Sequence, residues 1–396
     1  MKTYFADLHI HIGRTESGRP VKISAAHDLT FFNIADEASR RKGIDIVGII
    51  DCHSPAVQED IMRCLDRGEM AELAGGGIAY RETVVLLGSE IETRDAGLGP
   101  AHLIAYMPDL QAMRGLTGWM SRHMRNVNLS SQRLYAPARA LQEEIIGRGG
   151  FLVPAHVFTP HKGLYGSCTD RIAHLLDPGG IAALELGLSA DSQMAGYISE
   201  TDPYTFVSNS DAHSLGKIAR EYNAMALAAP TFAEVRKALA REGGRHVAAN
   251  YGLNPRLGKY HRAYCTRCGR IAETAGPVGE RCPHCGSGRI VNGVLDRILA
   301  IADRDEPHLP VHRPPYHYQV PLEFIPGLGR RTLNALLERF GTEMNILHKA
   351  SPEQLAAAAG EQIAACIVRA REGTLPIATG GGGRYGKVDL PSQAGS

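Results

Sequence analysis

The sequence predicts an α/β fold over residues 1–252, followed by two smaller units. Short apolar runs alternate there with stretches of helical spacing, a pattern typical of a parallel sheet. The pattern fits an open, doubly wound sheet and a closed barrel equally well. Beyond residue 252, two CxxC pairs and then further helical patterns mark a small polar module and a helical region.

The expected elements follow from the period of the apolar residues. The expected strands are the apolar runs at 4–10, 45–50, 84–91, 102–107, 151–153, 181–186, 206–207 and 224–227. Helical spacing covers 34–41, 59–73, 134–146 and 231–241. A polar segment at 113–133 carries four arginines and interrupts the alternation. We expect it to form an inserted loop or helix over one face of the sheet.

Composition excludes several classes of protein. The 396-residue chain has 43 Lys and Arg against 42 Asp and Glu, so no overall charge excess indicates a polyanionic partner. The apolar runs are too short to cross a membrane, and the amino terminus lacks the apolar core of a secretory signal. Four of the 8 cysteines lie outside the CxxC pairs, a usage that favours a reducing compartment. We therefore expect a cytoplasmic protein without a membrane partner.

Metal-compatible side chains recur where the expected strands end. His9 and His11 alternate at the end of the first run, so both imidazoles point to the same side. Asp211 and His213 follow the run at 206–207 in the same way. Histidines and carboxylates gathered there are costly to desolvate unless a charged group compensates them. The sequence therefore predicts a multinuclear metal site with candidate ligands His9, His11, His53, Glu90, His102, His156, Asp211 and His213.

Two neighbouring features allow two interpretations each. Asp7 and Asp51 precede candidate ligands by two residues, and they either orient the imidazoles or cap the strand ends. The loop at 13–22 contains Arg14 and Lys22, and it either contacts substrate phosphates or is simply solvated.

These residues carry a family resemblance. The motifs DLHIH at 7–11, DCH at 51–53, GSE at 88–90, PAH at 154–156 and SDAH at 210–213 resemble the motif series of the PHP (polymerase and histidinol phosphatase) phosphoesterases. The resemblance implies a distorted (β/α)7 barrel that binds two or three divalent ions, Zn, Mn or Mg. One ion would be held by His9, His11, Glu90 and Asp211, and a second by Glu90, His102 and His156. A third would use His53 and His213, but the loop after His11 lacks the third histidine that many members carry.

Such a metal cluster indicates the chemistry. Bound divalent ions lower the pKa of water and neutralise phosphoryl charge, so phosphoester hydrolysis is the predicted reaction. Asp211, Glu90 and His156 are the predicted catalytic residues. We expect the loss of Asp211 to be the most damaging, because it would serve as ligand and as acceptor of the proton from the attacking water.

The polar module predicts a structural zinc ion. Cys265, Cys268, Cys282 and Cys285 form two CxxC pairs whose thiolates can meet tetrahedrally around zinc. Residues 256–289 carry seven basic side chains, among them Arg267 and Arg270, against two acidic ones. This surface suits a nucleic acid backbone, although a solvated surface of a small domain would look similar.

The helical region contains a glycine-rich turn before a helical pattern. Residues 324–331 include Gly327, Gly329 and Arg330, and the apolar spacing that follows extends to residue 340. Backbone amides at such a helix start bind phosphate oxygens. The pattern resembles a helix-hairpin-helix DNA-binding motif, with further helices expected at 346–359 and 361–371.

The whole arrangement resembles the endonuclease Q family of DNA repair nucleases, including GRT at 13–15 and RPPY at 313–316. The resemblance implies metal-dependent cleavage of DNA on the 5′ side of uracil, hypoxanthine, xanthine and abasic sites, by a cytoplasmic enzyme associated with the nucleoid. The expected division is a PHP barrel at 1–252, a zinc module at 253–293, a helical domain at 294–375 and a disordered tail at 376–396. The expected DNA contacts are Arg14, Lys22, Arg267, Arg270, Gly327, Gly329 and Arg330. Two other functions fit parts of the pattern: a small-molecule phosphomonoesterase of the histidinol phosphatase type and a non-catalytic DNA-binding adaptor.

Overall fold

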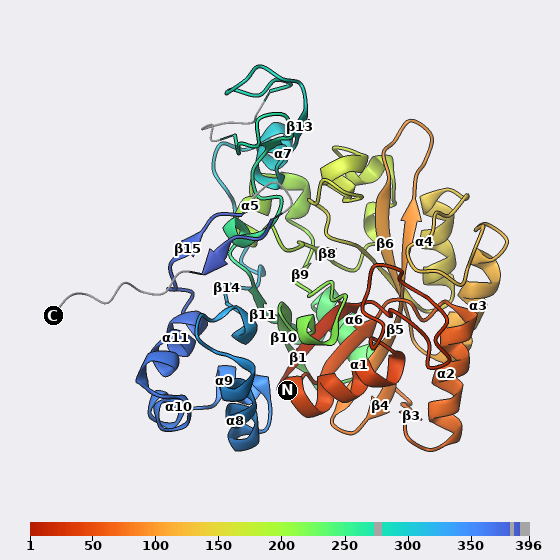
Figure 1. Cartoon of the computed structure of the whole chain (residues 1–396). Coiled ribbons are helices and arrows are strands. Elements are labelled where there is room, and N and C mark those ends of the chain that lie inside the picture. The colour runs from red at the N-terminus through yellow and green to blue at the C-terminus, as the bar shows by residue number, and fades with distance from the viewer. Residues whose placement is uncertain (273–278, 381–383, 389–396) are drawn as a thin grey trace.

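A computed structural model describes residues 1–272, 279–380 and 384–388 (Figure 1). Its largest part is a distorted α/β barrel centred on β1 (Lys2–Ile10). This strand pairs parallel with β2 (Ile46–Ile49) on one side and antiparallel with β10 (Tyr222–Leu227) on the other. Beyond β2 follow β5 (Thr83–Thr93), β6 (Ala101–Met107) and β7 (Phe151–Pro154).

Two short strands lie between the two sides of this sheet. The strands β8 (Leu184–Glu185) and β9 (Phe206–Val207) pair with each other in parallel. On one side, Ala182 donates its backbone N–H to Leu152 at 3.0 Å, next to β7. On the other side, the amide of Asn250 donates to the Phe206 carbonyl at 3.0 Å. These bonds connect β8 and β9 to both edges and close the barrel.

The sheet is mixed, so the prediction of an entirely parallel sheet is wrong. Strands β1, β2 and β5 are parallel neighbours, but β5 and β6, and β6 and β7, are antiparallel. The reason for the first reversal is that β5 continues into β6 through residues 94–100, without the intervening helix that a parallel crossover needs. The alternation of apolar runs along a sequence does not reveal such a hairpin.

Helices cover the outside of the barrel (Figure 1). They are α1 (Phe31–Glu37), α2 (Pro55–Asp66), α3 (Leu110–Met120), α4 (Ala138–Gly147), α5 (Ser192–Ala195) and α6 (Phe232–Ala240). The polar segment at 113–133 thus consists of the end of α3 and a long loop. A hairpin of β3 (Ala71–Glu72) and β4 (Ile78–Tyr80) extends the sheet beside β5. No helix within residues 1–272, 279–380 and 384–388 combines the length and the hydropathy needed to span a bilayer.

The Pro-rich connector at 306–321 belongs to the barrel sheet. Strand β11 (His246–Gly252) pairs with β10, and β14 (Tyr316–Tyr318) adds to it in parallel. The guanidinium of Arg313 donates to the carbonyls of Thr201 and Tyr204, each at 3.0 Å. It also lies 3.4 Å from the ring centroid of Phe206. A buried arginine therefore fixes the connector to the barrel.

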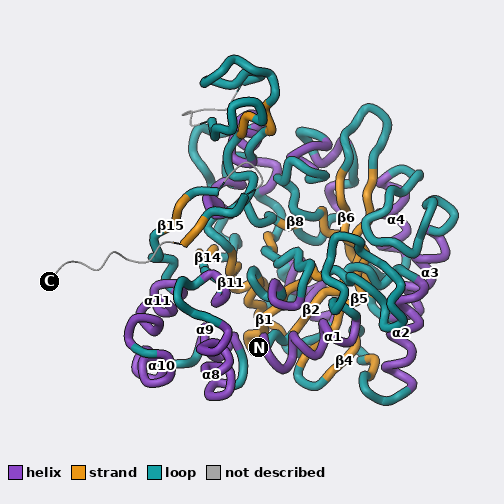
Figure 2. The backbone as a smooth tube through the Cα atoms, in the orientation of Figure 1, coloured by secondary structure: helices purple, strands orange, loops and turns teal. Residues whose placement is uncertain are grey.

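The four-cysteine module consists largely of loops (Figure 2). Its regular part is the antiparallel pair β12 (Tyr264–Cys265) and β13 (Ile290–Val291), after which α7 (Val294–Ile301) begins. Asp296 of α7 accepts a hydrogen bond from the backbone of Ala263 at 2.6 Å and pairs with Arg262. Residues 273–278 of the predicted module lie outside the described residues.

The helical region contains α8 (Arg330–Phe340), α9 (Glu343–His348), α10 (Pro352–Ala359) and α11 (Glu361–Arg371). The single helix expected at 346–359 is wrong, because α9 ends at His348 and α10 begins at Pro352. Ser351 caps α10 in a reciprocal capping box with Gln354, which favours a new helix start at this position.

The expectation of a disordered tail at 376–396 is wrong for its described part. There β15 (Ile377–Ala378) and β16 (Lys387–Val388) form an antiparallel hairpin. Gly380 and Gly386 donate backbone N–H groups to the carbonyls of Arg256 and Leu257, at 2.6 and 2.9 Å. The hairpin is held by backbone bonds, which leave no apolar periodicity in the sequence. Residues 381–383 and 389–396 of the predicted tail lie outside the described residues.

Candidate metal centre

All predicted metal ligands except His53 come together at the end of the barrel where β1 ends. Their ligand atoms form three groups: His9, His11 and Glu90; Glu90, His102 and His156; and His11, Asp211 and His213. Within each group these atoms lie within 4.8 Å of one another. Because His11 and Glu90 each belong to two groups, the groups adjoin and form a single centre.

The first group has the spacing of ligands around a small cation. His9 Nε2 lies 3.6 Å from Glu90 and 3.5 Å from Asp211. His11 Nε2 lies at the same distances, 3.6 Å and 3.5 Å, from these two carboxylates. These separations match pairs of ligand atoms that each lie about 2.1 Å from a shared zinc ion. Glu90 and Asp211 are far apart in the sequence, yet both carboxylates lie close to both imidazoles.

The second group contains polar atoms without partners. Glu90 Oε1 lies 2.8 Å from His102 Nδ1 and 3.4 Å from His156 Nε2. His102 Nε2 forms no hydrogen bond with any described residue, and the same holds for His9 Nε2 in the first group. Buried polar atoms are normally paired, so these orphaned nitrogens fit a site that binds cations. The donor set of imidazole and carboxylate suits Zn or Mn.

The third group lies nearest to solvent. His213 Nδ1 lies 3.6 Å from Asp211 Oδ1, and the side chains of both residues are about one third exposed, at 35% and 34%. Burial lowers the pKa of His213 to about 4, which keeps the imidazole neutral, the form that ligates metal. The group therefore has the exposure and protonation state of an accessible metal site.

His53 lies apart from these groups, so its role as a ligand stays a prediction. Its Nδ1 lies 2.8 Å from Ser89 Oγ, and its Nε2 lies 3.3 Å from the Leu129 carbonyl. It belongs to no candidate ligand group in the described part of the chain. Its two ring nitrogens already have protein partners, so it anchors the loop that contains Leu129.

The two aspartates before the ligands have different contacts. Asp51 Oδ2 lies 3.0 Å from His11 Nδ1, so it can orient this imidazole. Burial opposes ionisation of Asp51, but His11 outweighs it and lowers the pKa of the carboxyl to about 2. Asp7 instead accepts backbone hydrogen bonds from Ser210 and Ala219, at 3.0 and 2.8 Å. It therefore supports the loop that carries Asp211.

Glu185 is a member of the centre that the sequence analysis missed. Both of its carboxylate oxygens lie 3.0 Å from His9 Nδ1. It also accepts hydrogen bonds from the Asn209 amide at 2.7 Å and the His156 backbone at 2.8 Å. Glu185 lies in the apolar run 181–186, as Glu90 lies in the run 84–91, and this parallel is the signal that identifies it.

The loop after α3 covers the centre. Ser130 Oγ lies 3.2 Å from His11 Nδ1, and Ser131 donates a hydrogen bond to Glu90. Lys22 Nζ lies 2.6 Å from Ser131 and 3.4 Å from Glu90. The Lys22 side chain is 17% exposed and faces the ligands, so its role as a DNA contact stays a prediction. A lysine close to Glu90 reduces the negative charge that the carboxylates gather there.

The remaining predicted DNA contacts lie at the surface. Arg14 donates to the Gly18 carbonyl at 3.2 Å and remains partly exposed. Arg267 and Arg270 are exposed on the four-cysteine module, and Arg330 is exposed at the first position of α8. Gly327 has a φ of 82°, a conformation that favours glycine, and Gly329 caps α8. A Cβ built at either glycine would meet no other atom within 4 Å, so the turn is not packed against another part of the chain.

The four cysteines form one cluster. Cys265 and Cys285 have an Sγ–Sγ distance of 3.7 Å, and Cys268 and Cys282 have the same distance, 3.7 Å. All four Sγ atoms lie within 4.8 Å of one another. Sulfur atoms around a zinc ion with Zn–S bonds of about 2.3 Å have this spacing, so the cluster fits structural zinc.

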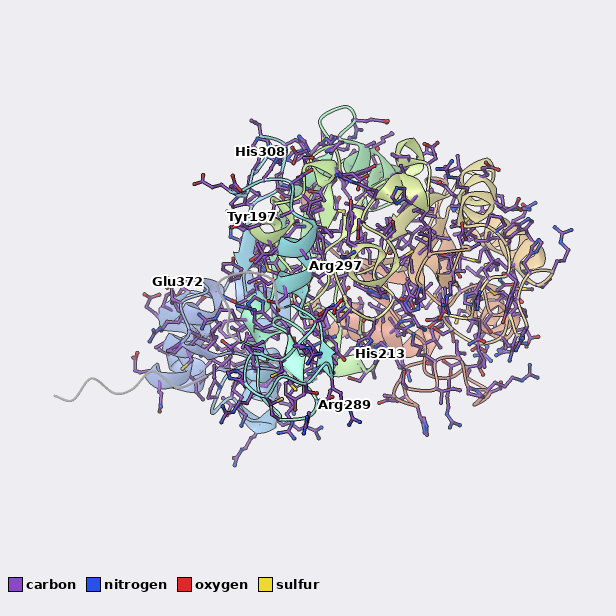
Figure 3. All side chains as sticks on the ribbon, turned by 90° about the horizontal axis from the view of Figure 1, so that it is seen from above. Tyr197, His213, Arg289, Arg297, His308 and Glu372 are labelled. Carbon is purple, nitrogen blue, oxygen red and sulfur yellow. The ribbon has the colours of Figure 1, made fainter. Side chains whose placement is uncertain are left out.

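A cleft of about 670 Å³ opens onto the metal centre. Its floor includes His102, His156, Asp211 and His213, and its walls include Lys259 and Tyr260 at the start of the four-cysteine module. Figure 3 shows the molecule from above, with His213 labelled on the barrel and Arg289 on the module. The cleft thus lies between the barrel and the module.

Comparison with known proteins extends over the full chain. No protein-family model matches it. The chain is 48% identical over 393 residues to the uncharacterized protein YqxK of Bacillus subtilis, covering 98% of this chain and 100% of YqxK. The crystal structure of the lesion-specific endonuclease PfuEndoQ from Pyrococcus furiosus matches with a TM-score of 0.84 and 31% identity, covering 99% of this chain and 96% of PfuEndoQ. The chain belongs to the endonuclease Q family.

A second endonuclease Q structure matches equally well. It is a complex with a 27-mer duplex substrate that has an abasic lesion at the active site. Its TM-score is 0.84 at 31% identity, and the match covers 99% of this chain and 98% of that one. The endonuclease Q fold therefore includes the barrel, the four-cysteine module and the helical region of this chain.

Proposed function

We propose that this protein is a metal-dependent DNA repair endonuclease. It hydrolyses the phosphodiester bond on the 5′ side of uracil, hypoxanthine, xanthine and abasic sites. The observation that carries the proposal is the joint presence of a His and carboxylate metal centre in an open cleft and a full-length match to endonuclease Q bound to an abasic duplex. A phosphatase for small molecules has no use for the module and helices beyond the barrel.

The ligand groups support a proposal for the metal positions. His9, His11, Glu90 and Asp211 would hold one divalent ion, and Glu90, His102 and His156 a second, with Glu90 between them. Bound there, such ions supply a water of lowered pKa and neutralise charge on the phosphate during in-line attack. His213 beside Asp211 offers ligand atoms for a third ion.

Asp211 is the residue best suited to receive the proton of the attacking water. The Glu90 side chain is 1% exposed, whereas the Asp211 side chain is 34% exposed and borders the cleft. Burial opposes its ionisation, but the histidines around it, His9 foremost, keep the pKa of Asp211 well below its usual value, so the carboxylate is ionised and able to bind metal. Its backbone φ of 45° is unusual for a residue other than glycine. The hydrogen bonds from Ser210 and Ala219 to Asp7 hold this loop in place.

Positive groups beyond the centre would position the DNA backbone. Lys162, Lys217, Arg220 and Lys259 line the cleft, and Arg267 and Arg270 are exposed on the module. The open turn at Gly327 and Gly329, followed by Arg330, offers amides and one cation to a second stretch of phosphates. Contacts of this kind fix the register of DNA without reading its sequence.

A nicking assay with end-labelled oligonucleotides tests this function. Each duplex or single strand contains one uracil, hypoxanthine, xanthine or abasic site, and reactions contain chelator or added Mg²⁺, Mn²⁺ or Zn²⁺. We expect a metal-dependent nick immediately 5′ of the altered nucleotide and none in the undamaged duplex. Equal nicking of undamaged DNA, or a phosphomonoester hydrolysed faster than every lesion, would contradict the proposal.

A further inference from the structure

We propose that Arg220, Lys259 and Tyr385 form a subsite for a non-scissile phosphate of the DNA strand, beside the metal centre. This inference rests on the proposed function and specifies which residues hold the backbone next to the cut. The three residues come from distant parts of the chain: the loop before β10, the start of the four-cysteine module and the C-terminal hairpin.

Arg220 is a buried cation whose described hydrogen-bond partners are carbonyl and hydroxyl oxygens. It is 7% exposed, and its Nε donates to the Ser210 carbonyl at 2.7 Å. Its Nη2 lies 3.4 Å from the carbonyl of Asp211 and its Nη1 donates to the Tyr385 hydroxyl at 3.0 Å. None of the carboxylates described in this structure forms an ion pair with it. A buried charge without a counterion is costly, so an anion is the expected occupant beside Arg220.

The cations that line the cleft divide into two kinds. Lys162 pairs with Glu92 and Lys217 pairs with Glu323, each at 2.6 Å. Arg220 and Lys259, in contrast, form no ion pair with any acidic side chain of the described ranges. The charge that remains for a ligand is therefore concentrated on the side of the cleft where Arg220 and Lys259 lie.

Tyr385 joins these two cations. Its hydroxyl accepts the hydrogen bond from Arg220, and its own O–H is left to donate. Lys259 Nζ lies 4.6 Å from the centroid of its ring. The hairpin holds Tyr385 in this position through the Gly386 backbone bond to Leu257. In Figure 1, β15 of this hairpin lies between the helical region and the module.

A phosphodiester fits this arrangement of donors. Its two free oxygens accept hydrogen bonds from guanidinium, ammonium and hydroxyl groups at once, and charge-assisted bonds of this type are strong. Asp211 and His213 line the same cleft, so a strand cleaved at the metal centre would place a neighbouring phosphate at Arg220 and Lys259. Docking of the C-terminal hairpin would therefore complete the substrate site.

The subsite is tested by combining single substitutions in the protein with single neutral linkages in the DNA. The measurement asks whether the effects of the two changes depend on each other. Abasic duplexes are prepared with one neutral methylphosphonate linkage at each position flanking the scissile phosphate. Single-turnover cleavage with excess holoenzyme then gives the half-saturating enzyme concentration for the wild type, Lys259→Met and Tyr385→Phe. The matched control is Lys2→Met, which removes an exposed cation at the opposite end of β1.

We expect one linkage at which the neutral replacement raises this concentration about tenfold for the wild type and for Lys2→Met. Lys259→Met and Tyr385→Phe should raise the half-saturating enzyme concentration severalfold on unmodified DNA. For these two variants, the neutral replacement at that linkage should raise it little further. If the effects of the substitution and of the neutral linkage are additive at every linkage, the proposed subsite is wrong, while the proposed nuclease function is unaffected. If the wild type cleaves no lesion duplex, the proposed function fails first and this inference fails with it. Tyr385→Phe is conservative, so it tests the subsite even where Lys259→Met folds poorly.

Discussion

Both carboxylate oxygens of Glu185 lie 3.0 Å from Nδ1 of His9, so the opposite nitrogen of the ring faces Glu90 and Asp211. Burial disfavours the charged imidazole, but Glu185 and Asp211 outweigh it and raise the pKa of His9 to about 10. The cluster of carboxylates thus attracts positive charge at His9 Nε2. A carboxylate that orients a ligating histidine in this way usually increases metal affinity.

Replacing Glu185 by Gln should weaken metal binding by about 10- to 100-fold. The amide removes the negative charge and disturbs the orientation of His9, while the size of the side chain stays the same. Metal affinity is measured by competition with a chromogenic chelator. Glu338→Gln, on the exposed face of α8, is the control with the same chemical change. Unchanged affinity in Glu185→Gln would show that Glu185 has no role at the metal.

Substitutions of Asp211 and His53 should have opposite effects. Asp211→Asn should lower the nicking rate by about 10²- to 10⁴-fold, the range for loss of a positioned proton acceptor. His53→Asn should retain all bound metal and most activity, because its nitrogens contact Ser89 and Leu129 instead of the ligand groups. It should still lose about 1–2 kcal/mol of stability from these hydrogen bonds.

Metal content by mass spectrometry, nicking rates and thermal unfolding check these two variants. Loss of one metal equivalent from His53→Asn would show that His53 is a ligand. Undiminished nicking by Asp211→Asn would exclude the proposed chemistry of the centre.

Glu221 should make the stability of the protein fall as the pH rises. Its carboxyl is fully buried and accepts a hydrogen bond from Leu253 at 2.8 Å, and burial raises its pKa from 4.5 to about 8. The folded protein therefore binds the proton more tightly than the unfolded chain does. The resulting stabilisation is complete below about pH 4.5 and is lost as the pH rises through about 8.

The amide of Glu221→Gln stays neutral at every pH and avoids this loss. The variant should therefore gain stability relative to the wild type between pH 5 and pH 8.5, by several kcal/mol at about 1.4 kcal/mol per pKa unit. Urea unfolding at both pH values measures the gain. Glu242→Gln, at an exposed position, should show none. The free energies of unfolding of the wild type and Glu221→Gln could instead differ by the same amount at both pH values. Glu221 would then already be ionised in the folded state.

The sequence predicted the features that depend on local spacing. The alternation of His9 and His11 at a strand end, and the spacing of the four cysteines, were sufficient to place these residues together. Glu185 was missed because a single carboxylate in a short apolar run also fits a surface loop. The contacts of His53 with Leu129 and of Lys22 with Ser131 were not predicted, because these partners lie in a loop more than 70 residues away. Contacts over such distances leave no periodic pattern.

The interface between barrel and helical region is another long-range feature. Lys42 Nζ lies 3.0 Å from both carboxylate oxygens of Glu343 and donates to the Gly216 carbonyl at 3.0 Å. The two side chains are 4% and 11% exposed. Arg41 Nε, at 3.7 Å, is a weaker second partner of Glu343. The pair therefore fixes α9, and with it α8 and its exposed turn, against the barrel.

Lys42→Met should destabilise the protein by about 3 kcal/mol, the low end for breaking a buried ion pair, because Arg41 compensates part of the Glu343 charge. The double variant Lys42→Met with Glu343→Leu should lose less than the two single variants together, since neither charge is then left alone. Urea unfolding of the metal-loaded protein measures all three, and Lys349→Met, at an exposed position, should change stability by no more than about 0.5 kcal/mol. A loss in Lys42→Met no larger than in this control would mean that packing alone holds the helical region. A loss confined to Lys42→Met and recovered in the double variant would show that this ion pair is not needed to hold the helical region, provided neither charge is left unpaired.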